Sequence, residues 1–262
     1  MREPHLTDHR TILRYGPMLD VDGLEILFAH NWYQEAEHIA ADLRPSGLRF
    51  PVVHAEKSIG PALGSAQAEE RVLALERLRI NCRLGERIGA RLLILHLWGR
   101  PGSDEHFERN LDMLGACLAM AASAGLELAV ETIPCDHADP LTNVQRAIQH
   151  DQRCLVALDT EFLAFHQQLE ESLKAQWLWQ EGRVRHVHMK DYDGRMTEPN
   201  GYRRYLHPGE GNIDFPGFFK GLAAQGFQGA ISLEASGVHQ DDSIDTERIQ
   251  RSLAFLRGLL EQ

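Results

Sequence analysis

Short apolar segments alternate with longer amphipathic segments along almost the whole chain. The apolar segments predict seven β-strands, because they are rich in Leu, Ile, Val and Ala and are bounded by polar residues or Gly. We expect these strands at residues 23–29, 48–54, 91–96, 126–131, 154–159, 184–189 and 229–234. Pro51 in the second strand indicates a bend or bulge, since proline cannot donate a backbone hydrogen bond.

Helical patterns separate these strands, and we expect helices at residues 9–19, 31–43, 65–88, 104–123, 140–150, 163–180, 215–224 and 245–260, with an irregular loop over 191–213. Apolar strands that alternate with helices are typical of a parallel sheet covered by helices. A length of 262 residues fits one (β/α)8 TIM-barrel domain spanning residues 1–262, since such barrels have about 250 residues. The first strand is predicted to be short or missing, because Pro4 and charged residues occupy the segment Met1–Thr7 where it would lie.

Six of the seven predicted strands finish with a titratable or metal-binding side chain: His54, His96, Glu131, Asp159, His188 and Glu234. In a β/α barrel the C-terminal strand ends meet at one mouth, where active sites lie. Any one of these residues alone is more often a solvated loop residue, a helix cap or a core histidine. Their recurrence at the same relative point predicts a metal or acid–base site.

The strand over 184–189 and the residues after it support this prediction. His186, His188 and Lys190 occupy alternate positions and therefore share one face of an extended segment. A buried strand carries such a face only where something polar lies opposite. Two Glu, one Asp and one His form an oxygen-rich set that suits one divalent ion (Mn²⁺, Mg²⁺, Co²⁺ or Zn²⁺). The set does not resemble a closed structural zinc site.

Composition restricts the partners. The net charge of −11 argues against a partner bound through its phosphate backbone, so no nucleic acid is expected. The four cysteines are scattered without a CxxC pair, which favours a reducing cytoplasm over a disulfide framework. The polar first residues predict no signal peptide, and no apolar run predicts a membrane span. Leu-rich outer helices leave a homo-oligomer possible.

Three segments of the C-terminal half carry a resemblance to a known family: Arg185–Asp191 (RHVHMKD), Pro208–Asp214 (PGEGNID) and Gly229–Glu234 (GAISLE). Together with Ala129–Thr132 and Leu155–Thr160, in this order, they resemble the xylose isomerase-like TIM barrels of the sugar phosphate isomerase/epimerase superfamily. The resemblance covers roughly residues 20–260. It implies that Glu131, Asp159, His188 and Glu234 hold one divalent metal ion.

The resemblance also implies a function. It indicates an isomerase or epimerase that acts on a carbohydrate, namely a sugar, sugar phosphate or polyol-derived ketone, by proton transfer through a metal-bound enediolate. Glu131 and Glu234 are then the catalytic acid and base. The substrate-binding candidates are His54, His96, Trp98, His186, Lys190 and His207.

Three alternatives stay open. The same site could dehydrate a keto-polyol. The chain also resembles DNA-repair AP endonucleases of the endonuclease IV type, although Phe162 and Tyr205 stand where a His and an Asp are expected for a three-zinc cluster. The third alternative is a non-catalytic metal-binding barrel, which is favoured by Phe162 and by the weak first strand.

Overall fold

The strands form a parallel sheet that curves into a nearly closed barrel. The structure is a computed structural model, and it describes residues 8–239 and 243–261. Within these residues the sheet has seven strands in the order β1 to β7, each hydrogen-bonded to the next one along the chain. The strands are β1 (Glu25–Leu27), β2 (Val52–His54), β3 (Leu92–Leu95), β4 (Glu127–Glu131), β5 (Leu155–Asp159), β6 (Val184–Met189) and β7 (Ala230–Leu233). The predicted first strand over Met1–Thr7 lies outside the described residues.

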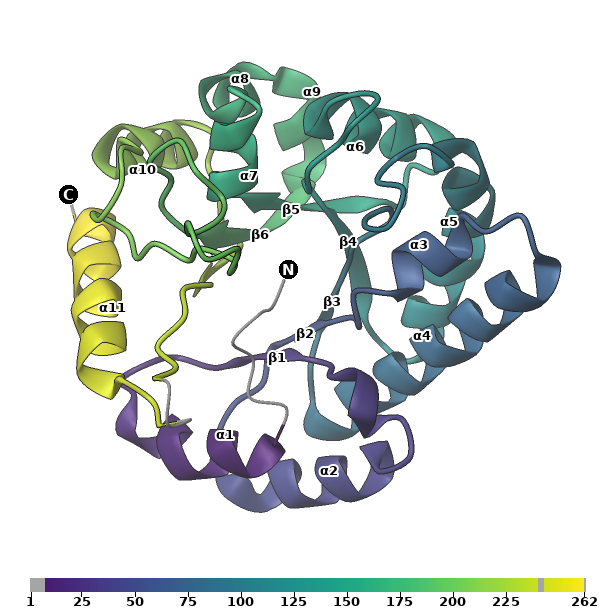
Figure 1. Ribbon diagram of the computed structural model, residues 1–262, viewed down its shortest axis with the longest axis horizontal. Helices are drawn as coiled ribbons and strands as arrows, with labels where there is room; N and C mark the ends of the chain where they lie inside the picture. Colours follow the sequence, from purple (N-terminus) through teal and green to yellow (C-terminus); the bar gives the residue numbers. More distant parts are fainter. Residues whose placement is uncertain (1–7, 240–242, 262) are drawn as a thin grey trace.

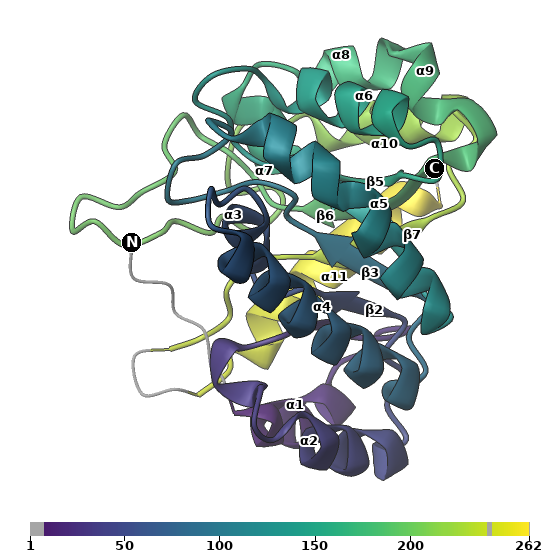
Figure 2. The same cartoon turned by 90° about the vertical axis from the view of Figure 1, so that its right-hand side faces the viewer.

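Helices surround the sheet, as Figure 1 shows in a view down the barrel. They are α1 (His9–Tyr15), α2 (Ala36–Leu43), α3 (Ile59–Leu63), α4 (Ala68–Ile88), α5 (Phe107–Ser123), α6 (Pro140–His150), α7 (Thr160–Phe165), α8 (Leu169–Lys174), α9 (Gln176–Trp179), α10 (Phe215–Ala224) and α11 (Thr246–Leu260). Figure 2 shows the barrel from the side, with the loop between β6 and α10 extending beyond the helices at one end. No helix among the described residues is long and apolar enough to cross a membrane.

The seven predicted strands are confirmed; β6 has the predicted bounds, and the other six are shorter than their apolar segments. β2 begins directly after Pro51, so the residue without a backbone N–H lies just outside the strand. The carbonyl of Pro51 still accepts a hydrogen bond from the Arg91 N–H at 2.9 Å. The single helix predicted over 163–180 is wrong, because the chain forms α7, α8 and α9 there. Gln167 between α7 and α8 has a φ of 58°, a left-handed conformation that ends a helix.

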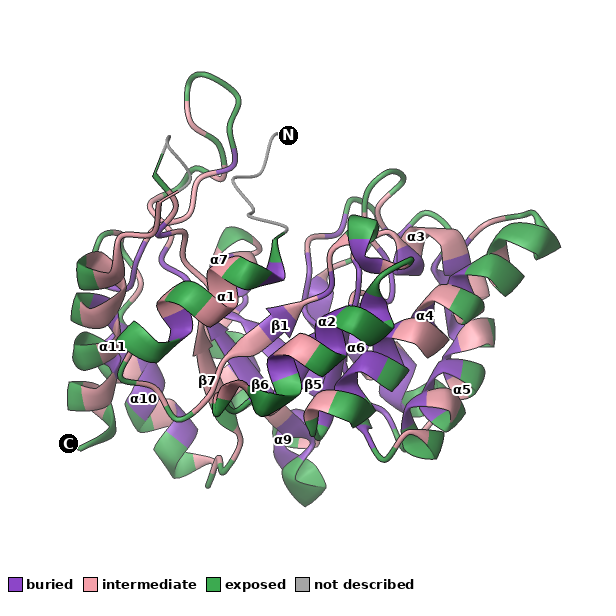
Figure 3. Ribbon diagram, turned by 90° about the horizontal axis from the view of Figure 1, so that it is seen from below, coloured by how far each residue is buried: buried purple, intermediate pink, exposed green. Residues whose placement is uncertain are grey.

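Two layers of side chains fill the inside of the barrel. Val52, Leu92, Ile94, Ala129 and Ala157 form a small apolar cluster that is separate from the main core between strands and helices. Because side chains two positions apart share a face of a strand, the next inward-facing residue on four of the strands is polar. These residues are His54, His96, Glu131 and Asp159. Figure 3 shows mostly buried residues on strands such as β5 and β6, intermediate and exposed ones on β7, and exposed ones on the outer helix faces. The apolar layer therefore supports a polar layer above it.

Candidate functional site

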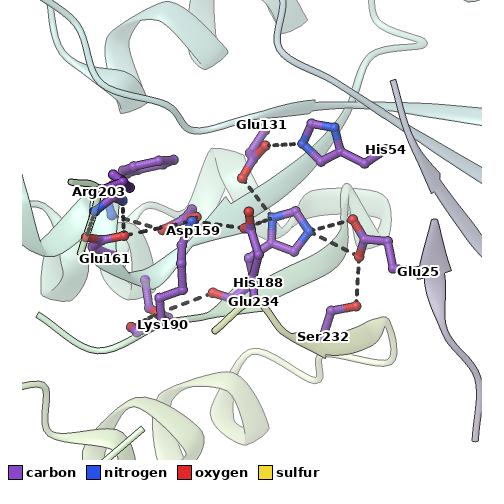
Figure 4. A network of polar contacts seen from close by, with 12 residues as sticks. Glu25, His54, Glu131, Asp159, Glu161, His188, Lys190, Arg203, Ser232 and Glu234 are labelled. Atoms are coloured by element: carbon purple, nitrogen blue, oxygen red, sulfur yellow. Dashed lines mark hydrogen bonds and ion pairs between the residues drawn. The ribbon is translucent and has the colours of Figure 1, made fainter. Parts of the chain in front are cut away.

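The C-terminal strand ends bring four predicted metal ligands together. β4 ends at Glu131 and β5 ends at Asp159. His188 is the second-last residue of β6, and Glu234 directly follows β7. One ligand atom from each of the four lies within 4.8 Å of the others. The first three are at most 1% exposed, whereas the side chain of Glu234 is 27% exposed. Figure 4 shows them as parts of one polar network.

His188 stands at the centre of this network between carboxylates. Its Nδ1 lies 2.7 Å from Glu131 Oε1 and 3.4 Å from Glu234 Oε2, while its Nε2 lies 2.9 Å from Glu25 Oε1. Burial disfavours the imidazolium, but the charges of Glu25 and Glu131 raise the pKa of His188 well above its usual value. Conversely, although burial opposes ionisation, the charge of His188 and its hydrogen bond with Glu131 lower the pKa of Glu131.

His54 and His96 contact the other oxygen of Glu131. His96 Nε2 lies 2.7 Å from Glu131 Oε2, and His54 Nε2 lies 3.0 Å from the same atom. His54 Nδ1 donates to the carbonyl of Ala55 at 2.8 Å, which orients the ring. Burial lowers the pKa of His96 to about 4, so this ring is neutral near pH 7. Both histidines therefore hold Glu131 in place from the β2 and β3 side.

Lys190 is buried against the acidic side of the site. Its Nζ lies 2.6 Å from Asp159 Oδ2 and 2.9 Å from Glu234 Oε2, and 4.2 Å from the centre of the Phe162 ring. Burial disfavours the ammonium, but Asp159 and Glu234 raise the pKa of Lys190 well above its usual value. Burial also opposes the charge of Glu234, yet Lys190 and His188 lower the pKa of Glu234 to about 2. Lys190 thus contacts two predicted metal ligands.

Two further buried residues extend the network into the loop after β6. Arg203 Nη1 donates to Glu161 Oε1 at 2.6 Å, and the second guanidinium nitrogen contacts the other oxygen of Glu161. Arg203 also donates to the carbonyls of Met196 and Arg204, so this pair fastens the loop to α7. Sequence reasoning missed Glu161, Arg203 and also Glu25.

The site has more negative than positive charge. Its carboxyl groups outnumber its cations, even though the raised pKa of His188 adds an imidazolium to Lys190 and Arg203. The carboxyl groups belong to Glu25, Glu131, Asp159, Glu161 and Glu234. Burial, followed by the nearby carboxylates and against the effect of Lys190, raises the pKa of Asp159 to about 7. A divalent cation among Glu131, Asp159, His188 and Glu234 would offset this excess, and their oxygen-rich donor set suits such an ion. The residues present therefore fit a metal.

A cavity of about 530 Å³ opens beside the network on the side of β1 and β7. Its wall includes Phe28, Trp32, His54, Lys57, Tyr205 and Glu234. Glu234 is thus the predicted ligand that reaches the cavity. Among the predicted substrate-binding residues, His54 also lines it.

The other predicted substrate-binding residues lie elsewhere. His186 is fully buried on β6, with Nε2 2.9 Å from Glu25 Oε2. Trp98 is fully buried and donates its indole N–H to the Pro134 carbonyl at 3.1 Å. His207 is 1% exposed and sits near Ser252 Oγ at 2.7 Å and the Ser236 carbonyl at 3.1 Å. The structure does not bring Trp98 or His207 into the network.

Glu25 was missed because it begins its strand rather than ending it. The segment Leu24–Leu27 shows one acidic residue between apolar neighbours. That pattern was the available signal, because a charged side chain on a buried strand requires a partner inside the protein. The partner histidines lie more than 160 positions later, so no local pattern could identify them.

Comparison with known proteins agrees with this architecture. A family model described as a xylose isomerase-like TIM barrel matches residues 17–259. The chain is similar in structure to 3-keto-D-glucoside 4-epimerase from E. coli, with 20% identity, a TM-score of 0.70, and 94% of this chain and 92% of the other covered. It is also similar to D-psicose 3-epimerase from Clostridium cellulolyticum H10 crystallised with D-tagatose, with 16% identity, a TM-score of 0.71, and coverage of 98% and 95%.

A third similar structure is D-allulose 3-epimerase from Methylomonas sp. in complex with D-allulose. It shares 17% identity with a TM-score of 0.69, over 95% of this chain and 89% of the other. At these identities the likeness is one of fold. No curated protein sequence matches the chain significantly.

Proposed function

The chain belongs to the xylose isomerase-like TIM-barrel family, and within it we propose that this protein is a divalent-metal-dependent sugar epimerase or isomerase. The observation that carries the proposal is the convergence of Glu131, Asp159, His188 and Glu234 at the barrel mouth. The similar solved structures support it, since all three named above are sugar epimerases. We propose a sugar, sugar phosphate or polyol-derived ketone as the substrate.

Glu131, Asp159, His188 and Glu234 would hold the ion. When bound there, a divalent ion would supply Lewis acidity to a carbonyl oxygen and the hydroxyl on the neighbouring carbon, which acidifies the hydrogen on that hydroxyl-bearing carbon. Asp159 is already oriented for this role, because its Oδ1 accepts the Phe162 N–H at 3.0 Å at the start of α7 and its Oδ2 faces the site.

Glu131 and Glu234 are the proposed proton carriers. Both have lowered pKa values and are therefore carboxylates near neutral pH, which is the form a general base requires. They come from different strands, so one carboxylate can take a proton from one face of a substrate carbon. The other, after taking up a proton from solvent, can deliver it to the opposite face, and the first proton is then released to solvent. Glu131 is held by His54 and His96, whereas Glu234 meets the cavity.

The cavity supports a small substrate. Its volume of about 530 Å³ lies within the range of small-molecule sites. The polar groups in its wall include Lys57, His54 and Glu234, which can contact hydroxyl groups, while Phe28 and Trp32 provide apolar surface. The same proton carriers could eliminate water next to a carbonyl, so dehydration of a keto-polyol is a reaction to test alongside epimerisation.

The experiment is to follow exchange of carbon-bound hydrogen in deuterated water by NMR, with a panel of ketoses and keto-sugars and added Mn²⁺. Glu131→Gln and Glu234→Gln should each slow exchange by about 100-fold or more, the usual contribution of a positioned acid or base. The matched control is Glu127→Gln, at the exposed opposite end of β4, which should keep full activity. Full activity of either active-site variant, with circular dichroism unchanged, would contradict the assigned roles.

A second candidate function is a DNA-repair nuclease, favoured by a second cluster of His54, His96 and Glu131, which shares Glu131 with the first and whose ligand atoms also lie within 4.8 Å of one another. The positions expected to complete a three-metal cluster carry Phe162 and Tyr205, whose rings face Lys190 Nζ at 4.2 and 5.9 Å. Metal analysis separates the two functions. About one ion per chain supports the epimerase or isomerase, and about three zinc ions per chain support the nuclease.

A further inference from the structure

Glu25 lies on the side of the barrel where the described sheet does not close. Within residues 8–239 and 243–261, β1 and β7 are the outer strands and are not hydrogen-bonded to each other. The side chain of Glu25 is 15% exposed and points from β1 across this gap. Its carboxylate accepts a hydrogen bond from Ser232 Oγ on β7 at 2.8 Å. A carboxylate therefore links the two outer strands inside the barrel.

The same carboxylate reaches both histidines of β6. Glu25 Oε2 lies 2.9 Å from His186 Nε2, and Oε1 lies 2.9 Å from His188 Nε2. The strand register explains the geometry, because Glu25 pairs with Val52 and His186 pairs with Ala157, and both partners belong to the apolar layer below the site. Glu25 and His186 are thus the polar pair within that layer, and His188 stands one layer higher.

The contact with His188 decides which nitrogen is free to bind a metal. An ionised carboxylate only accepts hydrogen bonds, so the imidazole nitrogen facing Glu25 must carry the hydrogen. That nitrogen is Nε2, so Nδ1 is the nitrogen left for a metal ion, which would replace the hydrogen that Nδ1 directs at Glu131 in the metal-free protein. Nδ1 is the nitrogen directed at Glu131 and Glu234, at 2.7 and 3.4 Å.

We propose that Glu25 is a positioning residue for the metal centre, and this inference rests on the proposed function. Glu25 holds His188 with hydrogen on Nε2 and keeps Nδ1 aimed at Glu131 and Glu234. Ser232 orients the Glu25 carboxylate for this task. A carboxylate behind a metal-binding histidine commonly changes metal affinity by 10- to 100-fold.

The test measures Mn²⁺ binding by isothermal titration calorimetry for the wild type, Glu25→Ala, Glu25→Gln and Ser232→Ala. Glu25→Ala should weaken Mn²⁺ affinity by about 10- to 100-fold without changing the number of ions per chain. Glu25→Gln should weaken it less, because the amide oxygen still accepts from Nε2–H. Ser232→Ala should have the smallest effect, because the contact with His188 remains. The matched control is again Glu127→Gln, which should bind Mn²⁺ like the wild type.

Two further readouts separate positioning from a purely structural role. Thermal unfolding of the metal-free variants reports the loss of the link between β1 and β7, which a structural role alone also predicts. Imidazole ¹⁵N shifts of the Zn²⁺-loaded wild type should show His188 with hydrogen on Nε2. Lower melting temperatures together with unchanged Mn²⁺ affinity, or hydrogen on Nδ1, would overturn the inference.

If Glu25→Ala does not fold, the Gln and Ser232→Ala variants decide the question, and wild-type affinity in both overturns the inference. A wild type that binds no divalent ion overturns the proposed metal centre together with the role of Glu25. A wild type that binds Mn²⁺ normally, with variants that bind it equally well, overturns the role of Glu25 alone.

Discussion

Replacing Lys190 by Met tests how the acidic side of the site is stabilised. The substitution preserves length and apolar volume but removes an ammonium that lies 2.6 Å from Asp159 Oδ2 and 2.9 Å from Glu234 Oε2. Removing one partner of a buried ion pair costs about 3–5 kcal/mol, because the remaining charge is left uncompensated. For a chain of this size, that loss lowers the melting temperature by about 6–20 °C.

The loss should also depend on pH. Burial and the nearby carboxylates already raise the pKa of Asp159 to about 7, and removal of Lys190 raises it further. A group whose pKa is higher in the folded protein than in the unfolded chain stabilises the fold when protonated. Its stabilising contribution is lost as pH rises through the folded pKa. Lys190→Met should therefore be least destabilised near pH 6 and increasingly destabilised toward pH 8, by at most about 1.4 kcal/mol per pH unit for one group.

The assay is urea or thermal unfolding of the metal-free protein at pH 6, 7 and 8, followed by circular dichroism. The matched control is Lys174→Met, whose Nζ contacts Glu170 at 3.1 Å on the surface of α8 with the Lys side chain 75% exposed. This control should change the free energy of unfolding by no more than about 0.5 kcal/mol. Equal stability losses in the two variants, or a pH-independent loss at Lys190, would refute the reasoning. Mn²⁺ should stabilise Lys190→Met more than the wild type, because it returns positive charge to the same carboxylates.

Two further predictions follow from individual contacts. The pKa of Glu234 is lowered to about 2, against 4.5 for the free side chain, so its stabilising contribution is present above pH 4.5 and lost as pH falls toward 2. The free energy of unfolding of Glu234→Gln should therefore fall less steeply with decreasing pH than that of the wild type across this range. Gly60→Ala places a Cβ 2.0 Å from the backbone oxygen of His96, so α3 must move away from the end of β3. It should lower the free energy of unfolding by about 1–3 kcal/mol and shift the His96 imidazole signals in NMR spectra.

The sequence was sufficient for the strands because a strand covered on both faces needs an uninterrupted apolar segment, and all seven such segments form strands. It was insufficient for the helix over 163–180, since the chain breaks at Gln167, in a left-handed conformation, where no Gly or Pro marks a helix end. The four predicted metal ligands are brought together because their place at strand ends is a property of the fold. Their roles remain predictions.

Side-chain direction beyond the strand ends could not be predicted in the same way. Trp98 follows β3 and is predicted to line the pocket, but its indole N–H donates to the Pro134 carbonyl and its side chain is fully buried. Lys190 follows β6 and was expected near substrate, yet it turns toward Asp159. Both outcomes depend on loops that pack over the strand ends, and loop conformation depends on tertiary contacts that are distant in sequence.

The substitution of Phe162 for the histidine expected in relatives now has a physical interpretation. Its ring faces Lys190 Nζ at 4.2 Å and the Arg203 guanidinium at 5.6 Å, so it supports two cations where a histidine would offer a ligand. The Asp159 side of the site is consequently closed by packing and by ion pairs. The cavity lies on the opposite side, along β1 and β7, where Glu234 meets it. Glu234 lines the cavity and Glu131 does not, so the two proposed proton carriers are unequal in access to it although they are alike in charge.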